Sequence, residues 1–161
     1  MTAANSSFQT LLQAYGESAG FEVKHAVEAL DFDSDGLVVR VCVDPRQSTR
    51  LLLQVVCGSL DEALDSRGEA HIALMLHHIN SAARLEHDWV ITIDPARTVQ
   101  LHHQSDIAQT TVAGLDHLMS EATERGHALQ QILDKLQQAA LSAKTDKSSH
   151  EDLPLHGMLR G

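Results

Sequence analysis

Residues 37–57 read LVVRVCVDPRQSTRLLLQVVC, and they decide the fold because two strand-like runs flank one turn. Branched aliphatic residues recur at alternate positions in 37–43, and a second aliphatic run fills 50–57. Such runs are typical of β-strands, whereas the intervening Asp44-Pro45 is typical of a turn. The stretch therefore predicts two strands that follow each other in the chain.

Alternation also assigns the side chains of these strands to the two faces of a sheet. One face carries an apolar set that begins at Leu37 and Leu51, whereas Val38, Leu52 and Val56 fall on the other face. Helices are expected to cover one face of so small a sheet, so the last three side chains would be exposed in a monomer. The alternative, that this chain covers both faces by itself, fits the pattern equally well.

Helix and strand signals continue on both sides of this stretch. Ser6 and Gln9 have the spacing of a capping box, and they predict a first helix that ends near Gly20. The other expected elements are a weak strand over 26–32, a helix over 66–83, strands over 89–93 and 98–103, and a helix over 107–143. The order α-β-β-β-α-β-β-α predicts an α+β fold, with a twisted, largely antiparallel sheet and helices packed on one face.

Length and composition predict one domain. The chain has 161 residues, and 43% of them are hydrophobic, which is enough for a buried core. A polar run begins at Lys144. We therefore expect the domain to span residues 1–143 and a flexible C-terminal tail to span 144–161.

Charge and hydropathy exclude several classes of protein. The chain holds 12 Lys and Arg against 22 Asp and Glu, and it lacks the basic cluster that a phosphate backbone requires, so we predict no nucleic-acid binding. It shows neither a secretory signal pattern nor an apolar run long enough to span a membrane. Cys42 and Cys57 lie on opposite kinds of sheet face, which argues against a disulfide. These features predict a cytoplasmic protein without a membrane span.

Eleven histidines raise the question of a metal site. Two ligands on one helix must be three or four residues apart, whereas His77 and His78 are adjacent and point about 100° apart. His117 and Glu121 have the required spacing but lack a visible third ligand. The sequence also lacks the usual motifs of nucleophiles, phosphate loops and dinucleotide sites. We therefore predict no metal site, no cofactor and no enzymatic activity.

Several stretches occur together in an informative order: FQTLLQAYGESAGF (8–21), GSLDEA (58–63), LMLHHIN (74–80), WVITIDP (89–95) and a long last helix. With these stretches the chain resembles the class I chaperones of bacterial type III secretion, the Tir-chaperone (CesT-like) family. The resemblance covers about residues 7–140. It implies a homodimer that binds the N-terminal region of secreted effector proteins, keeps them soluble and competent for export, and delivers them to the secretion apparatus and its ATPase.

The resemblance suggests where effectors and a second subunit would bind. Phe8, Leu12 and Tyr15 share one face of the first helix, and we expect this face to bind effectors while Leu11 anchors the helix to the core. Val38, Leu52 and Val56 supply a second effector-binding patch. In the family the second helix lies near the two-fold axis, so the expected dimer interface consists of His71, Ile72, Met75, His78, Ile79 and Trp89.

A function from another class remains open. If all 11 histidines were protonated, the formal charge of −10 would rise by 11, to +1. The chain would then be a His-rich, metal- or pH-responsive α+β regulatory module. Tight, stoichiometric binding of zinc, nickel or copper would favour that alternative.

Overall fold

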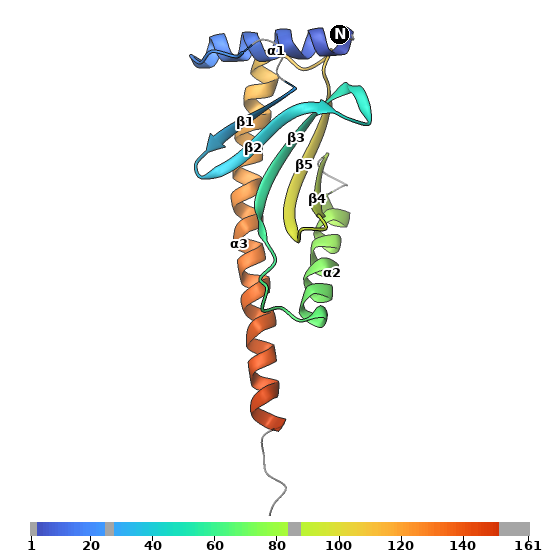
Figure 1. Ribbon diagram of the computed structural model, residues 1–161, viewed down its shortest axis with the longest axis vertical. Helices are drawn as coiled ribbons and strands as arrows, with labels where there is room; N and C mark the ends of the chain where they lie inside the picture. Colours follow the sequence, from blue (N-terminus) through green and yellow to red (C-terminus); the bar gives the residue numbers. More distant parts are fainter. Residues whose placement is uncertain (1–2, 25–27, 84–87, 152–161) are drawn as a thin grey trace, which may run out of the picture.

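The computed structural model describes residues 3–24, 28–83 and 88–151. Within them, helices and strands follow the predicted order (Figure 1). The helices are α1 (Ala3–Ala19), α2 (Ser66–Ala83) and α3 (Val112–Glu151). The strands are β1 (Ala29–Ser34), β2 (Leu37–Asp44), β3 (Gln47–Ser59), β4 (Trp89–Ile93) and β5 (Thr98–Asp106).

The strands form one antiparallel sheet in the order β1-β2-β3-β5-β4. β2 and β3 are the two strands that flank Asp44-Pro45, and Val39 pairs with Val55 in their register. β1 and β4 are the outer strands. The predicted α+β class and antiparallel sheet are therefore confirmed.

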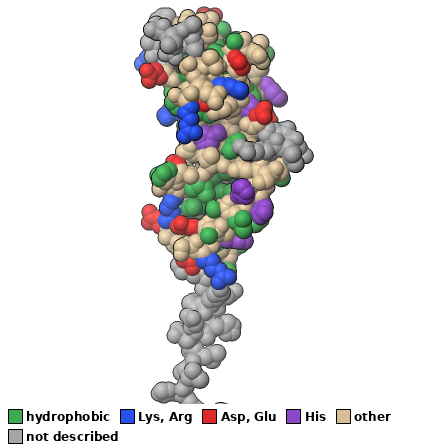
Figure 2. All heavy atoms as spheres, turned by 90° about the vertical axis from the view of Figure 1, so that its right-hand side faces the viewer, with side chains coloured by type: hydrophobic (Ala, Val, Ile, Leu, Met, Phe, Trp, Pro, Cys, Tyr) green, Lys and Arg blue, Asp and Glu red, His purple; other side chains and the backbone are tan. Residues whose placement is uncertain are grey.

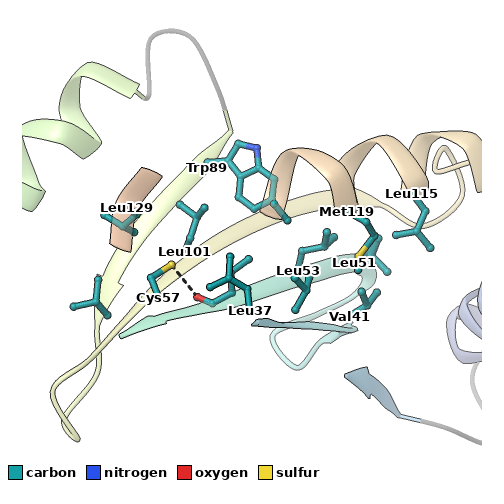
Figure 3. Packing of buried hydrophobic residues seen from close by; sticks show 14 of the residues in the cluster. Leu37, Val41, Leu51, Leu53, Cys57, Trp89, Leu101, Leu115, Met119 and Leu129 are labelled. Carbon is teal, nitrogen blue, oxygen red and sulfur yellow. Dashed lines mark hydrogen bonds between the residues drawn. The ribbon is translucent and has the colours of Figure 1, made fainter. Parts of the chain in front are cut away.

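All three helices pack on one face of the sheet, where they enclose the core. α3 runs the length of the molecule behind β2 and β3, α1 crosses one end, and α2 lies beside β4 (Figure 1). Alternate strand residues such as Val41 and Leu53 are completely buried, and they lie near Met119 of α3 (Figure 3). These are the apolar positions that alternation assigned to one face.

Gly126 explains why α3 approaches the sheet so closely. A Cβ atom at this position would lie 2.7 Å from Cδ1 of Leu37 and 3.0 Å from Cγ1 of Val55. Glycine is usually unfavourable within a helix, but here its missing side chain leaves room for two strands.

Helix and strand ends differ from the expectations at several points. α1 begins at Ala3 rather than after Ser6. Asp65 caps α2, because its Oδ1 accepts a hydrogen bond of 2.8 Å from the Gly68 amide. The strand expected over 26–32 lies at Ala29–Ser34, and positions 26 and 27 fall outside the described residues.

The last helix differs at both ends. It begins at Val112 rather than at 107, because Thr111 Oγ1 accepts a hydrogen bond of 3.0 Å from the Gly114 amide and so caps the helix. It continues to Glu151, beyond the boundary expected after residue 143. The division into a domain over 1–143 and a tail over 144–161 stays a prediction, and 152–161 lie outside the described residues.

Candidate protein-binding surfaces

The face of the sheet opposite the helices is covered by no helix of the described chain, and we call it the open face. Val38 and Val56 lie on it, one residue beyond the paired Val39 and Val55, and their exposed fractions are 48% and 43%. These two valines form the apolar pair of the open face. The third residue predicted for this patch, Leu52, is half-buried and pairs with Cys42.

A row of polar side chains crosses the open face between Val56 and Leu52. On β1 and β2, Arg40 donates two hydrogen bonds, of 2.7 and 2.8 Å, to the carboxylate of Asp31. Arg40 is paired in turn with Gln54 of β3, and Gln54 with His102 of β5. The predicted apolar patch is therefore divided, with the valine pair on one side of this polar row and Leu52 on the other.

His102 is one of the residues that line a concavity of about 1000 Å³ over β3, β5, β4 and the turn between β2 and β3. Its Nε2 lies 2.8 Å from Thr92 Oγ1, and its Nδ1 lies 3.5 Å from Gln54 Nε2. Burial lowers the pKa of His102 below its usual value, so the ring is neutral at neutral pH. The concavity is thus lined by neutral hydrogen-bonding side chains such as His102, and also by charged ones: Asp44, Arg46, Arg50 and Asp88.

The outer edge of β1 is a further candidate surface. Asp35 and Gly36 form a two-residue turn between β1 and β2, and both have positive φ. In such a hairpin, alternate residues direct their N–H and C=O groups away from the partner strand, which on β1 applies to Asp31 and Asp33. Phe21 lies close by, 36% exposed, with its ring centroid 5.6 Å from that of Phe32. An open strand edge therefore adjoins exposed aromatic surface.

The residues of α1 that were expected to bind effectors are buried in the core, and they form no surface. The exposed fractions of Phe8, Leu12 and Tyr15 are 1%, 0% and 8%, and Leu11 is also buried. Together they form one apolar stripe that packs against α3 and β3, since a stripe of this width is what a helix on a core requires. The division of this stripe into an anchor and a binding face had no counterpart in the structure.

The residues expected at a dimer interface lie in two different environments. His71 and His78 are exposed on α2, while Met75 and Ile79 are half-buried beside them. Ile72 and Trp89 are in the core, with exposed fractions of 0% and 3%, because both side chains point to the helix-covered face. These two are therefore not on the surface of a monomer. Leu74, which is not among the residues expected at the interface, is 52% exposed.

Figure 2 shows the side of the molecule on which α2 lies, with hydrophobic and histidine side chains gathered over it. Leu74, His71, His77 and His78 are among the exposed residues of α2. Acidic and basic side chains lie at the borders of this surface, and the area between them is largely uncharged (Figure 2). Such an area is suited to contact with another protein chain.

No site for metal or nucleophilic chemistry emerges within the described residues. They contain no group of three or more His, Cys, Asp and Glu side chains that could hold a metal ion. Glu121, the partner suggested for His117, instead accepts a hydrogen bond of 2.8 Å from Arg125. Both cysteines are free, and burial raises the pKa of the Cys57 thiol to about 11. No described helix is long and apolar enough to cross a membrane.

Sequence reasoning missed three contributors to these surfaces: Phe21, Gln54 and Asn80. Phe21 and Asn80 lie within stretches that carry the family resemblance, but neither was assigned a role, and Gln54 was not singled out. The carboxamide of Asn80 bonds to the backbone of β4. Their partners are distant in sequence, so no local pattern could have identified these contacts.

No protein-family model matches the sequence, and no curated protein matches it either. Solved structures are nevertheless similar. A chain of the ExsC-ExsE complex has a TM-score of 0.67 and 19% identity, over 83% of this chain and 97% of that one. A chain of the HopA1-SchA chaperone-effector complex has a TM-score of 0.65 and 14% identity, over 81% and 98%.

The type III secretion chaperone SycH of Yersinia pestis, solved with a fragment of YscM2, gives a third match. Its TM-score is 0.56 at 16% identity, over 76% of this chain and 98% of that one. The three alignments span nearly the whole of each compared chain and 76–83% of this one. This chain therefore has the fold of a type III secretion chaperone.

Proposed function

We propose that this chain is a cytoplasmic type III secretion chaperone, which binds the N-terminal region of effector proteins and keeps them soluble and export-competent. The observation that carries the proposal is an uncovered sheet face with exposed valines, in a fold whose solved examples include a chaperone-effector complex. Delivery to the secretion apparatus and its ATPase is part of the same proposal. The role requires no cofactor.

An extended effector segment has two places to bind. The valine pair, Val38 and Val56, offers apolar contact on the open face, with Leu52 beyond the polar row. The edge of β1 offers backbone groups for an added strand, with Phe21 as an adjacent apolar contact. Main-chain hydrogen bonds would give affinity, and the side-chain contacts would give specificity.

A homodimer formed through α2 completes the proposal. Leu74 and Met75 would be buried against the second subunit, with His71 and His78 at the border. Leu74 is the main support for this interface. Its aliphatic side chain is half exposed in the monomer, so its burial in a dimer would contribute favourable free energy.

Affinity purification from the native bacterium under secretion-inducing conditions tests the function. The unaltered chain should recover secreted proteins, and Val38→Asp together with Val56→Asp should lose them. A matched control is Gln131→Asp together with Gln138→Asp, which adds the same two carboxylates at exposed positions of α3, away from the open face. Recovery of only metabolic enzymes or DNA-binding proteins by the unaltered chain would refute the proposal.

The alternative of a His-rich metal-responsive module has no observation in its favour within the described residues. Calorimetry with zinc on tag-free protein would still distinguish the two functions, since the chaperone requires no metal.

A further inference from the structure

The two outer strands of the sheet are not equivalent. β1 forms one edge, and β4 forms the other, beside the C-terminal end of α2 (Figure 1). Any outer strand exposes N–H and C=O groups that can pair with a strand of another chain. A protein that binds extended segments must therefore control which of its edges is available.

The side chain of Asn80 forms hydrogen bonds with the backbone of β4 at the middle of the strand. Its Oδ1 accepts a hydrogen bond of 2.6 Å from the Ile91 amide, and its Nδ2 donates one of 2.7 Å to the Ile91 carbonyl. Ile91 is opposite Leu101 of β5, and alternate residues of an antiparallel edge direct both groups outward. The carboxamide thus makes the two bonds that a residue of a neighbouring strand would make.

The position of α2 makes this contact possible. Asn80 lies in the last turn of the helix, which ends at Ala83, and the helix packs against β4. Leu76, one turn earlier, is buried in the core and fixes the helix at this distance. The carboxamide is therefore held against Ile91 by the packing of α2.

β1 has no comparable contact in the part of the chain that the structure describes. The outward backbone groups of Asp31 and Asp33 have no backbone partner there, and the side chain of Asp31 is directed to Arg40 on the open face. Within the described residues, one edge of the sheet is closed by a side chain, and the other has no such contact.

We propose that Asn80 closes the β4 edge and so directs the addition of an extended segment to β1. The inference rests on the proposed function for the identity of that segment, an effector. The inference also predicts a new partner for the Ile91 backbone when the Asn80 carboxamide is removed. The exposed Ile91 backbone groups would pair with the β4 strand of a second copy of this chain.

Size-exclusion chromatography with light scattering tests the closure on the chain alone, without any effector. Asn80→Ala should have a higher mass than the unaltered chain at the same concentration. Ser81→Ala is the matched control, because the Ser81 hydroxyl bonds only to the His77 carbonyl of its own helix, at 3.0 Å. This control should keep the mass of the unaltered chain.

A second change at Ile91 separates strand pairing from general destabilisation. Proline lacks the outward N–H, and it is tolerated on an outer strand where that N–H does not bond to the sheet. Adding Ile91→Pro to Asn80→Ala should restore the original mass. Adding Ile91→Val, which keeps the N–H, should not.

Hydrogen exchange provides a readout that does not depend on the folding of any variant. In the unaltered chain the Ile91 amide should exchange about tenfold more slowly than the Asp31 amide, because only Ile91 has a partner on the outer side. Equal exchange rates would overturn the proposal, as would an Asn80→Ala mass equal to that of Ser81→Ala or one that Ile91→Pro fails to restore. Because none of these measurements includes an effector, they can fail while effector capture succeeds.

Discussion

Arg97 and Glu69 form an ion pair of 2.6 Å that connects the turn between β4 and β5 to the first turn of α2. The same guanidinium donates a hydrogen bond of 2.8 Å to the Asp61 carbonyl, and the Arg97 carbonyl accepts one of 2.9 Å from the Leu60 amide. Arg97 makes these contacts with φ at +67°, in the left-handed region that favours glycine. Its side chain therefore stabilises a backbone conformation that is costly in itself.

Two substitutions at this position separate the backbone from the side chain. Arg97→Ala loses the contacts and keeps the unfavourable φ, whereas Arg97→Gly loses the contacts and relieves it. We expect the glycine variant to be more stable than the alanine variant by about 1 kcal/mol. Urea unfolding measures the difference, and equal stabilities would show that the left-handed conformation has no cost here.

Substitution by aspartate should unfold the chain at Leu12 but not at Val38. Leu12 is completely buried, so Leu12→Asp places an unpaired carboxylate in the core and should unfold the chain. Val38 is half exposed, so Val38→Asp should keep the circular dichroism spectrum and change stability by no more than about 0.5 kcal/mol. A folded Leu12→Asp variant would contradict the core position of α1.

Gly126→Ala should destabilise the fold although alanine favours helices. The gain in helix propensity is about 1 kcal/mol, while a methyl group 2.7 Å from Leu37 Cδ1 should cost about 1–3 kcal/mol. Combining it with Leu37→Val, which shortens that side chain, should recover part of the loss. The double-mutant cycle in urea gives the coupling, and purely additive effects would exclude contact between the two positions.

The dimer prediction can be tested at one exposed residue. Leu74→Asp should leave the monomer folded, because the side chain is 52% exposed, but it should lower the mass measured by light scattering at micromolar concentration. Ala73→Asp is the control, since it is also exposed and lies about 100° away around α2. If the unaltered chain is already monomeric at this concentration, the dimer through α2 is wrong.

Stability should fall between neutral and mildly acidic pH because of His103 and, by the same effect of burial, His102. Burial lowers the pKa of the His103 ring below its ordinary 6.5, against the opposing influence of Asp88 and Glu121. A histidine whose pKa is lowered by folding stabilises the fold above its unfolded pKa, and that contribution is lost as the pH falls below about 6.5. The free energy of unfolding should therefore be lower at pH 5.5 than at pH 7.5, a range that avoids most carboxylates.

Trp89 reports this change directly. It is the only tryptophan of the chain, and its ring centroid lies 4.8 Å from that of His103. Its fluorescence should follow the protonation of His103, and His103→Gln should remove that response. His102→Gln, which alters the neighbouring histidine on the open face, should leave it. A fluorescence titration that is unchanged in His103→Gln would contradict the prediction.

The alternation in residues 37–57 was sufficient to predict β2, β3 and their faces, because a strand between helices and solvent imposes a period of two on the chain. Periodicity does not distinguish a helix stripe that covers a core from one that binds a partner, which is why Phe8 and Tyr15 were misplaced. Contacts such as Asn80 with Ile91 depend on how separate elements pack. Such contacts exist only in the folded chain and leave no local pattern in the sequence.

The polar row across the open face has a consequence for the sequence of any segment that lies along β2 and β3. Such a segment would meet the valine pair first, then Arg40 with Gln54, and then Leu52, each two residues further along the strands. An extended chain directs every second side chain toward the surface beneath it. A matching segment would therefore carry an apolar residue, a polar residue and an apolar residue at positions i, i+2 and i+4, a pattern that can be sought in candidate effector sequences before any binding experiment.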